Sequence, residues 1–201
     1  MTLTAIIVRH GNTFVAGEPP RRIGARTDIP LVDSGRAQAK ALGALFAQSA
    51  RFDRLLAGPL RRTQETARII AAAQSHPIAI ETCDWLAEID HGPDEDMPED
   101  KVLARLGAVT LAAWDDNAVA PTHWIVDADR RIEAWRGLLE GASGRTVIVT
   151  SNGAARFALL AHRDLLRQAR QLPSMKLRTG AWGCILREKA VLSLDAWDQR
   201  P

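Results

Sequence analysis

Three segments of the sequence bring together residue types that bind anions. Arg9 and His10 follow a short apolar run, and Arg62 follows a second such run. Asn152 and Arg156 follow a third. Arginine side chains bind phosphate oxygens through two parallel hydrogen bonds, and helix N-termini offer free N–H groups to an anion. These residue types therefore predict a site for a phosphate group.

The elements that must position these residues alternate between strands and helices. Apolar runs predict strands at residues 3–8, 52–57, 78–81 and 146–150, and a closing hairpin at about 180–187 and 190–196. Helical spacing predicts helices from Asp33, from Pro59, over about 98–114 and 122–140, and from Asn152. This alternation predicts a three-layer α/β/α fold with a mostly parallel central sheet and an antiparallel edge. Ligands of such sheets bind at the carboxyl ends of the strands, where the basic groups should meet.

The length of the chain, 201 residues, suits a single domain with one substantial core. Residues 86–100 are dense in acidic residues and prolines, and helical patterns follow them. We therefore expect one domain over residues 1–201, with a lid or insertion at about 86–142 that covers one end of the sheet.

Composition and charge argue against several classes of partner. A formal net charge of +2 gives no sign of a nucleic-acid or membrane-surface protein. The apolar run before Arg9 is too short for a signal-peptide core, and no run approaches membrane-spanning length. Cys83 and Cys184 lack disulfide or metal spacing, and the acids near His91 show no recognised ligand spacing. We expect a cytoplasmic protein with free thiols, no bound metal, and no membrane or nucleic-acid partner.

Five segments follow one another in a characteristic order. They are Arg9-His10-Gly11-Asn12-Thr13, Asp28 to Leu31 with Gly35 to Ala39, Gly58 to Ala67, Leu86-Ala87-Glu88 with Gly92, and Val147 to Arg156. This order resembles the signatures of the histidine phosphatase superfamily, which includes the cofactor-dependent phosphoglycerate mutases. The resemblance spans nearly the whole chain and implies a phosphoglycerate mutase-like fold.

The resemblance also implies roles for the polar residues of these segments. His10 would attack phosphorus through one ring nitrogen and become a phosphohistidine. That nitrogen must be unprotonated, so a backbone carbonyl should hold the other one. Arg9, Arg62 and Asn12 would bind the phosphoryl oxygens. Glu88 would protonate the leaving oxygen and then activate water, which calls for a raised pKa in a closed pocket.

One position departs from the family pattern: Ser151 stands where the family carries a second histidine. A serine donates a neutral hydrogen bond, roughly half as strong as a charge-assisted one, and the Asn152 amide could add another. We therefore expect Ser151 and Asn152 to bind phosphate in a reduced clamp. Alternatively, His91 in the acidic loop fills the space, whereas His162 lies inside a predicted helix and should be packed there.

Three functions fit these residues. The first expectation is a phosphatase that hydrolyses a small phosphomonoester, because family mutases tend to be longer than this chain. The alternatives are a phosphoglycerate mutase-type phosphotransferase and a weakly catalytic phosphate-binding protein that results from the change to Ser151. No cofactor is needed, and a homodimer is allowed because several family members pair. Arg21, Arg22 and Arg26 could reach an anionic substrate, and Trp85 could form a pocket wall.

Overall fold

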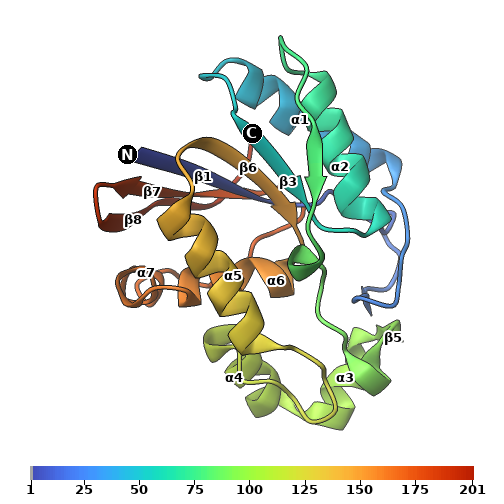
Figure 1. Ribbon diagram of the computed structural model, residues 1–201. Coiled ribbons are helices and arrows are strands. Elements are labelled where there is room, and N and C mark those ends of the chain that lie inside the picture. The colour runs from blue at the N-terminus through green and yellow to red at the C-terminus, as the bar shows by residue number, and fades with distance from the viewer. Residues whose placement is uncertain (1) are drawn as a thin grey trace.

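A six-stranded sheet forms the centre of the protein in a computed structural model that describes residues 2–201 (Figure 1). The strand order is β4-β3-β6-β1-β7-β8. The strands are β1 (Thr2–Arg9), β3 (Arg54–Ala57), β4 (Ile80–Thr82), β6 (Gly144–Thr150), β7 (Trp182–Glu188) and β8 (Val191–Gln199). Four of them, β1, β3, β4 and β6, run parallel, and β7 and β8 add an antiparallel hairpin at one edge.

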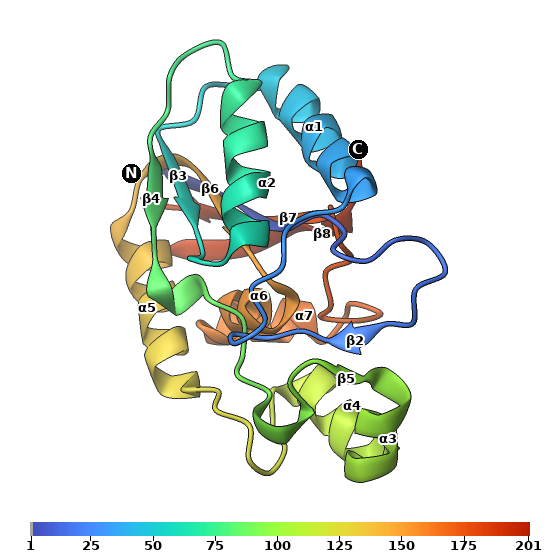
Figure 2. The same ribbon diagram turned by 90° about the vertical axis from the view of Figure 1, so that its right-hand side faces the viewer.

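Helices cover both faces of this sheet (Figures 1 and 2). One face carries α1 (Asp33–Ala47) and α2 (Arg61–Ala72). The other carries α5 (Ala128–Gly141), α6 (Asn152–Leu160) and α7 (Arg163–Ala169). The predicted three-layer α/β/α fold, with its mostly parallel sheet and antiparallel edge, is confirmed.

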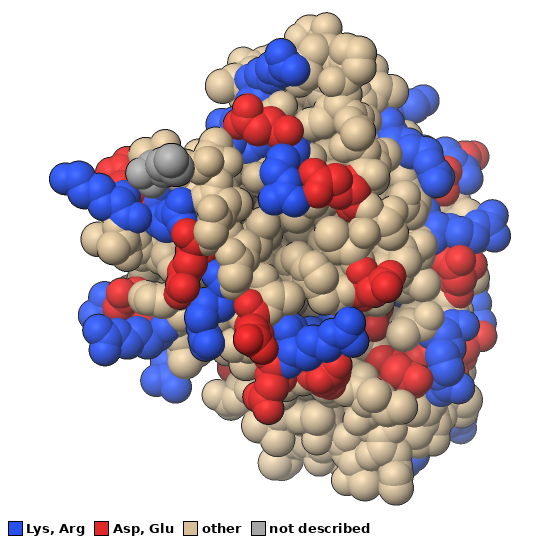
Figure 3. Space-filling model, in the orientation of Figure 1, with Lys and Arg blue, Asp and Glu red and all other residues tan. Residues whose placement is uncertain are grey.

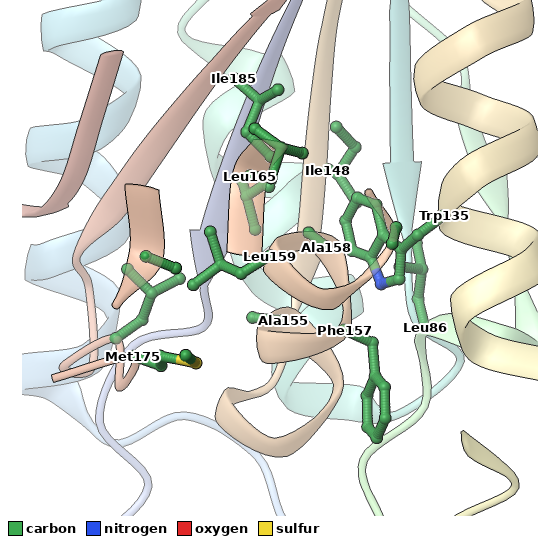
Figure 4. Packing of buried hydrophobic residues seen from close by; sticks show 14 of the residues in the cluster. Leu86, Trp135, Ile148, Ala155, Phe157, Ala158, Leu159, Leu165, Met175 and Ile185 are labelled. Carbon is green, nitrogen blue, oxygen red and sulfur yellow. The ribbon is translucent and has the colours of Figure 1, made fainter. Parts of the chain in front are cut away.

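The central strand β1 is buried on both faces, as its unbroken apolar run predicts. Ile6 and Val8 point into one hydrophobic cluster, with Leu42 of α1. Ile7 points into the other, which holds Trp135 of α5 and the buried residues of α6 (Figure 4). Both clusters therefore fix the end of β1, where Arg9 and His10 leave the sheet.

The remaining elements lie beyond the carboxyl ends of the parallel strands. A two-stranded sheet joins β2 (Arg21–Arg22) to β5 (Met97–Pro98), and α3 (Glu99–Leu106) and α4 (Ala108–Asn117) follow it (Figure 2). Two short 3-10 helices, Asp84–Leu86 and Gly92–Asp94, lie in the loop before β5. The single helix predicted over 98–114 is wrong: it breaks at Gly107, whose φ of 77° is unfavourable for other residues.

The second wrong prediction concerns His162, which was expected inside a helix. The chain instead leaves helical geometry between α6 and α7, and His162 is extended, with φ −143° and ψ 139°. Its Nδ1 accepts a hydrogen bond from the backbone N–H of Asp164 at 3.3 Å and so caps α7. The break lets α7 turn Leu165 into the core.

The loop after β1 is held against the start of α1 by close backbone contact. A Cβ atom on Gly35 would lie 2.2 Å from the carbonyl oxygen of Asn12, and one on Gly11 would lie 2.3 Å from that of Gly35. The side chain of Gln38 accepts the backbone N–H of Asn12 at 2.8 Å. Gly35 and Gln38, both in the second segment noted above, therefore position the residues beside His10.

This contact predicts that Gly35→Ala destabilises the protein, because the added methyl must push the loop away. We expect a loss of about 1–3 kcal/mol in the free energy of unfolding, measured by urea denaturation. Gly137→Ala in α5 is the matched control, since a Cβ there meets no other heavy atom within 4 Å. It should stabilise the protein by about 0.5–1 kcal/mol. Equal effects of the two substitutions would contradict this account of the loop.

Candidate active site

His10 follows directly after β1, and its backbone N–H and carbonyl both form hydrogen bonds to other segments of the chain. Its N–H donates to the carbonyl of Thr150 at 3.0 Å, and its carbonyl accepts from Gly180 at 3.1 Å. The Nδ1 atom lies 2.8 Å from the carbonyl oxygen of Gly11. A carbonyl only accepts, so Nδ1 carries the proton and Nε2 keeps its lone pair. This is the carbonyl contact expected from the sequence.

The charge state of His10 follows from its surroundings. The side chain is buried, and two guanidinium groups, those of Arg62 and Arg9, lie close to it. Burial, followed by the positive charges of Arg62 and Arg9, lowers the pKa of His10 well below 6.5. The imidazole is therefore neutral at neutral pH and can act as a nucleophile through Nε2.

Arg62 is fully buried at the start of α2 and is anchored by two backbone carbonyls. Its Nη1 donates to Thr27 at 2.7 Å, and its Nη2 donates to Gly24 at 3.0 Å. Burial lowers the pKa of Arg62, and the negative charge of Glu88 opposes this shift more than that of any other acid. Within residues 2–201 its Nε finds no acceptor, so one buried donor stays available to an anion.

Arg9 provides a second anchored guanidinium at the end of β1. Its Nη1 donates to the carbonyl of Leu177 at 2.7 Å, and its Nε has no acceptor in the described part of the chain. Burial lowers the pKa of Arg9 to about 10, so the side chain remains positive at neutral pH. Two guanidinium groups thus flank His10, an arrangement that suits a phosphoryl group.

Glu88 faces these cations from the loop after β4. Its Oε1 accepts the backbone N–H of Ile89 at 2.9 Å, and its Oε2 accepts that of Gly153 at 3.1 Å, at the start of α6. A Cβ on Gly153 would lie 2.3 Å from Oε1. Only glycine at this position therefore allows the carboxylate to sit on the N-terminus of α6.

The pKa expected for Glu88 is wrong for the free protein. Burial raises it, but His91, the backbone N–H groups of Ile89 and Gly153, and Arg62 outweigh burial, so the pKa lies below 4.5. The sequence indicated a closed pocket, yet it gave no sign of the two N–H donors that stabilise the carboxylate. In the free protein Glu88 is therefore ionised at neutral pH.

His91 is buried beside Glu88, with its ring edge-on to Trp124 at a centroid separation of 4.4 Å. Its Nδ1 lies 3.7 Å from a carboxylate oxygen of Glu95, too far for a hydrogen bond. Burial lowers the pKa of His91 to about 4, although Glu88 opposes the shift. His91 is therefore neutral at neutral pH.

Ser151 and Asn152 lie at the start of α6, next to Gly153. Ser151 is fully buried, and its Oγ has no hydrogen-bond partner among the described residues. The Oδ1 of Asn152 accepts the backbone N–H of Leu177 at 2.9 Å, which leaves its amide N–H₂ group free to donate. The Asn12 amide donates to Ser34 at 3.2 Å, and its oxygen accepts from Thr179.

A cavity of about 660 Å³ opens in front of these groups. Arg9, Glu88, His91, Asn12 and Asn152 line it. His10, Arg62 and Ser151 do not line the cavity: they are buried, and in the chain His10 adjoins Arg9 and Ser151 adjoins Asn152. The structure thus places at this cavity Arg9, Asn12, Glu88 and Asn152 of the residues that the sequence singled out for phosphate chemistry.

Two other expectations fare differently. Trp85 is not part of the cavity wall; it packs edge-to-face on Trp135, with ring centroids 5.0 Å apart. Arg156 lies with its guanidinium over the ring of Trp114 and donates to the carbonyl of that residue. Arg156 therefore connects α6 to α4.

Among residues 2–201, no group of three or more His, Cys, Asp or Glu side chains could hold a metal ion, and no helix could cross a membrane.

Arg131 contributes to the site, although the sequence did not single it out. Its guanidinium donates to the carbonyls of Val126 at 2.7 Å and Ala87 at 2.7 Å, and to that of Trp85 at 3.1 Å. These bonds fix the loop that carries Glu88. Arg131 is one of several arginines in α5, so only knowledge of its burial distinguishes it from a surface residue.

Comparisons with known proteins agree with this geometry. The model of a family described as "Histidine phosphatase superfamily (branch 1)" matches residues 5–199. The chain is 30% identical over 110 residues to the 2,3-bisphosphoglycerate-dependent phosphoglycerate mutase 2 of Gloeobacter violaceus. That match covers 54% of this chain and 49% of the mutase, so the chain spans about half the length of this relative.

Solved structures with the same fold include two phosphatases. The mycobacterial glucosyl-3-phosphoglycerate phosphatase has a TM-score of 0.78 at 20% identity, over 98% of this chain and 99% of that one. The alpha-ribazole phosphatase from Shigella flexneri has a TM-score of 0.72 at 22% identity, over 98% and 96%. At these identities the likeness concerns the fold.

The buried, neutral His91 predicts a loss of stability in mild acid. The unfolded chain binds a proton near pH 6.5 but the folded chain only near pH 4, so the free energy of unfolding falls as pH drops through this interval. His91 should account for about 2 kcal/mol of this loss at pH 5. Urea denaturation of His91→Gln should show a shallower decline than the wild type. His162→Gln, at a partly exposed histidine, is the control. Parallel curves for wild type and His91→Gln would refute the prediction.

Proposed function

The chain belongs to the histidine phosphatase superfamily (branch 1), and from this premise we propose that it is a phosphatase that hydrolyses a small phosphomonoester through a phosphohistidine on His10. One observation carries the proposal. The hydrogen bond from Nδ1 to the carbonyl of Gly11 leaves the Nε2 lone pair free, in a ring kept neutral between Arg9 and Arg62. A neutral imidazole beside two fixed guanidinium groups can attack a bound phosphoryl group.

In the first step, Nε2 of His10 forms a bond to phosphorus while the ester P–O bond breaks. Arg9 and Arg62 hold the phosphoryl oxygens, and their unpartnered Nε donors are available for this contact. The Oγ of Ser151 donates a further hydrogen bond. Each donor is already fixed by the protein, so little reorganisation accompanies the charge movement in the transition state.

Glu88 supplies the proton for the leaving oxygen. In the free protein it is ionised, but a bound phosphate dianion places negative charge beside it and raises its pKa. Glu88 can then take up a proton with the substrate and pass it to the departing alkoxide. In the second step the carboxylate removes a proton from water, a P–O bond forms, the P–N bond breaks, and inorganic phosphate leaves.

A phosphoglycerate mutase-type phosphotransferase is the second candidate, because the matched relative from Gloeobacter violaceus carries that name. A mutase must keep its phosphohistidine from water and return the phosphoryl group to a second acceptor. Stimulation of the reaction by a bisphosphate would favour it. A weakly catalytic phosphate-binding protein is the third candidate, since Ser151 replaces a histidine.

Three further assignments accompany the proposed activity. We take residues 1–201 as one domain, with a lid or insertion at about 86–142. We assign the protein to the cytoplasm, which the free thiols of Cys83 and Cys184 support. The phosphotransfer chemistry uses no metal or cofactor, and a homodimer stays a prediction.

The role of His10 predicts the outcome of a direct substitution. His10→Ala should lower kcat/KM for p-nitrophenyl phosphate and other phosphomonoesters by at least about a thousandfold, because no other group can form the covalent intermediate. His162→Ala serves as the matched control and should retain the wild-type rate. Substantial hydrolysis by folded His10→Ala, or no hydrolysis of any phosphomonoester by the wild type, would contradict the proposed function.

The role of Ser151 predicts a smaller effect on the same reaction. Ser151→Ala should lower kcat by about tenfold to a hundredfold, because it removes one donor to the transition state. Ser49→Ala, at an exposed position, is the control. An unchanged rate in Ser151→Ala together with a large loss in His91→Ala would instead place His91 in the phosphate clamp.

A further inference from the structure

Beyond the groups next to His10, the outer wall of the cavity carries three cations, Arg21, Arg22 and Lys176. Each of them is already bound to a carboxylate. The pairs are Arg21 with Asp96 at 2.7 Å, Arg22 with Glu99 at 2.5 Å, and Lys176 with Asp115 at 2.6 Å. Two of the three loop arginines that could have reached an anionic substrate, Arg21 and Arg22, therefore hold the segment 96–99, and Arg26 pairs with Asp90 at 3.0 Å.

The same cations have further contacts that hold them in place. The guanidinium of Arg21 lies 5.3 Å from the ring centroid of Phe14, and that of Arg22 lies 5.2 Å from that of Trp124. Asp115, the partner of Lys176, also lies 3.5 Å from Arg156. A substrate anion would therefore meet each of these three cations with its charge already partly offset by a carboxylate.

Two of the paired carboxylates, those of Glu99 and Asp115, themselves line the cavity. An anionic group on the substrate would approach these carboxylates as well as the cations, so much of the attraction of the outer wall for it is cancelled. Many Lys and Arg side chains likewise lie against Asp or Glu side chains on the face shown in Figure 3.

The rest of the outer wall combines apolar side chains, those of Phe14, Val15, Ala16, Pro20, Ile23 and Trp114, with uncharged hydrogen-bonding groups. The hydrogen-bonding groups belong to Asn12, Thr13, Ser34, Asn152 and Thr179. Hydroxyl groups of a ligand can both donate to and accept from such side chains, and they can donate to the paired carboxylates. This chemistry suits a polyol or sugar, whose hydroxyls need no compensating charge.

We propose that the cavity selects phosphomonoesters whose leaving group is neutral and bears hydroxyl groups, and that it discriminates against leaving groups that carry a carboxylate. The inference rests on the proposed phosphatase activity and adds the class of substrate to it. Arg9 and Arg62 then serve the phosphoryl group alone, while the three paired cations shape the wall.

A matched pair of substrates tests this selectivity. Glycerol 3-phosphate and 3-phosphoglycerate have the same phosphate-bearing carbon and the same neighbouring hydroxyl, and they differ only in a hydroxymethyl group against a carboxylate. We expect kcat/KM to be at least about tenfold higher for glycerol 3-phosphate, since a carboxylate gains no free cation. Inhibition of p-nitrophenyl phosphate hydrolysis by each compound gives the same comparison where turnover is slow. Equal values, or a preference for 3-phosphoglycerate, would overturn the proposal.

Removal of a paired carboxylate should shift the selectivity in a known direction. Asp115→Asn removes the partner of Lys176, and Glu99→Gln removes the partner of Arg22. Each substitution should therefore change the ratio of the kcat/KM values of the two substrates in favour of 3-phosphoglycerate, by about threefold to tenfold. Asp116→Asn, next to Asp115 but exposed, is the control and should leave the ratio unchanged. An unchanged ratio in both cavity variants would also overturn the proposal. A wild type that hydrolyses no phosphomonoester at all would overturn the phosphatase assignment itself.

Discussion

The hydrogen bond between Nδ1 of His10 and the carbonyl of Gly11 is the interaction on which the site depends. It fixes the tautomer and directs the Nε2 lone pair away from the backbone. The bond depends on the conformation of the loop after β1. In that conformation the backbones of Gly11 and Gly35 pack so closely that a side chain on either residue would clash. The contact between this loop and the start of α1 thus helps to set the tautomer of His10.

The burial of charged side chains is the second constraint. Backbone groups offset its cost by forming hydrogen bonds to each of these side chains. The two arginines beside His10 donate to carbonyls of Leu177, Thr27 and Gly24, and the carboxylate of Glu88 accepts two backbone N–H groups. In each arginine these bonds leave the Nε atom without an acceptor among the described residues. The carboxyl ends of β1, β3 and β6, from which the chain reaches these residues, lie side by side in the sheet.

Some of this arrangement could be predicted from the sequence. The apolar runs predict the central strand and the layers, and they place Arg9 and His10 at the end of that strand, because these features depend on local pattern. The pKa of Glu88 could not be predicted, since it depends on an N–H of Gly153, 65 residues away along the chain. The pairing of Arg21 and Arg22 with Asp96 and Glu99 is equally non-local. It engages two candidate substrate contacts in ion pairs with the segment 96–99.

The tautomer and charge of His10 can be read directly by long-range ¹H–¹⁵N NMR of the ¹⁵N-labelled protein, with His10→Ala used for assignment. The account predicts a neutral ring that is protonated on Nδ1 and unprotonated on Nε2, with no change from about pH 8 to about pH 6. A ring protonated on Nε2, or one that titrates near the ordinary histidine pKa of about 6.5, would contradict it.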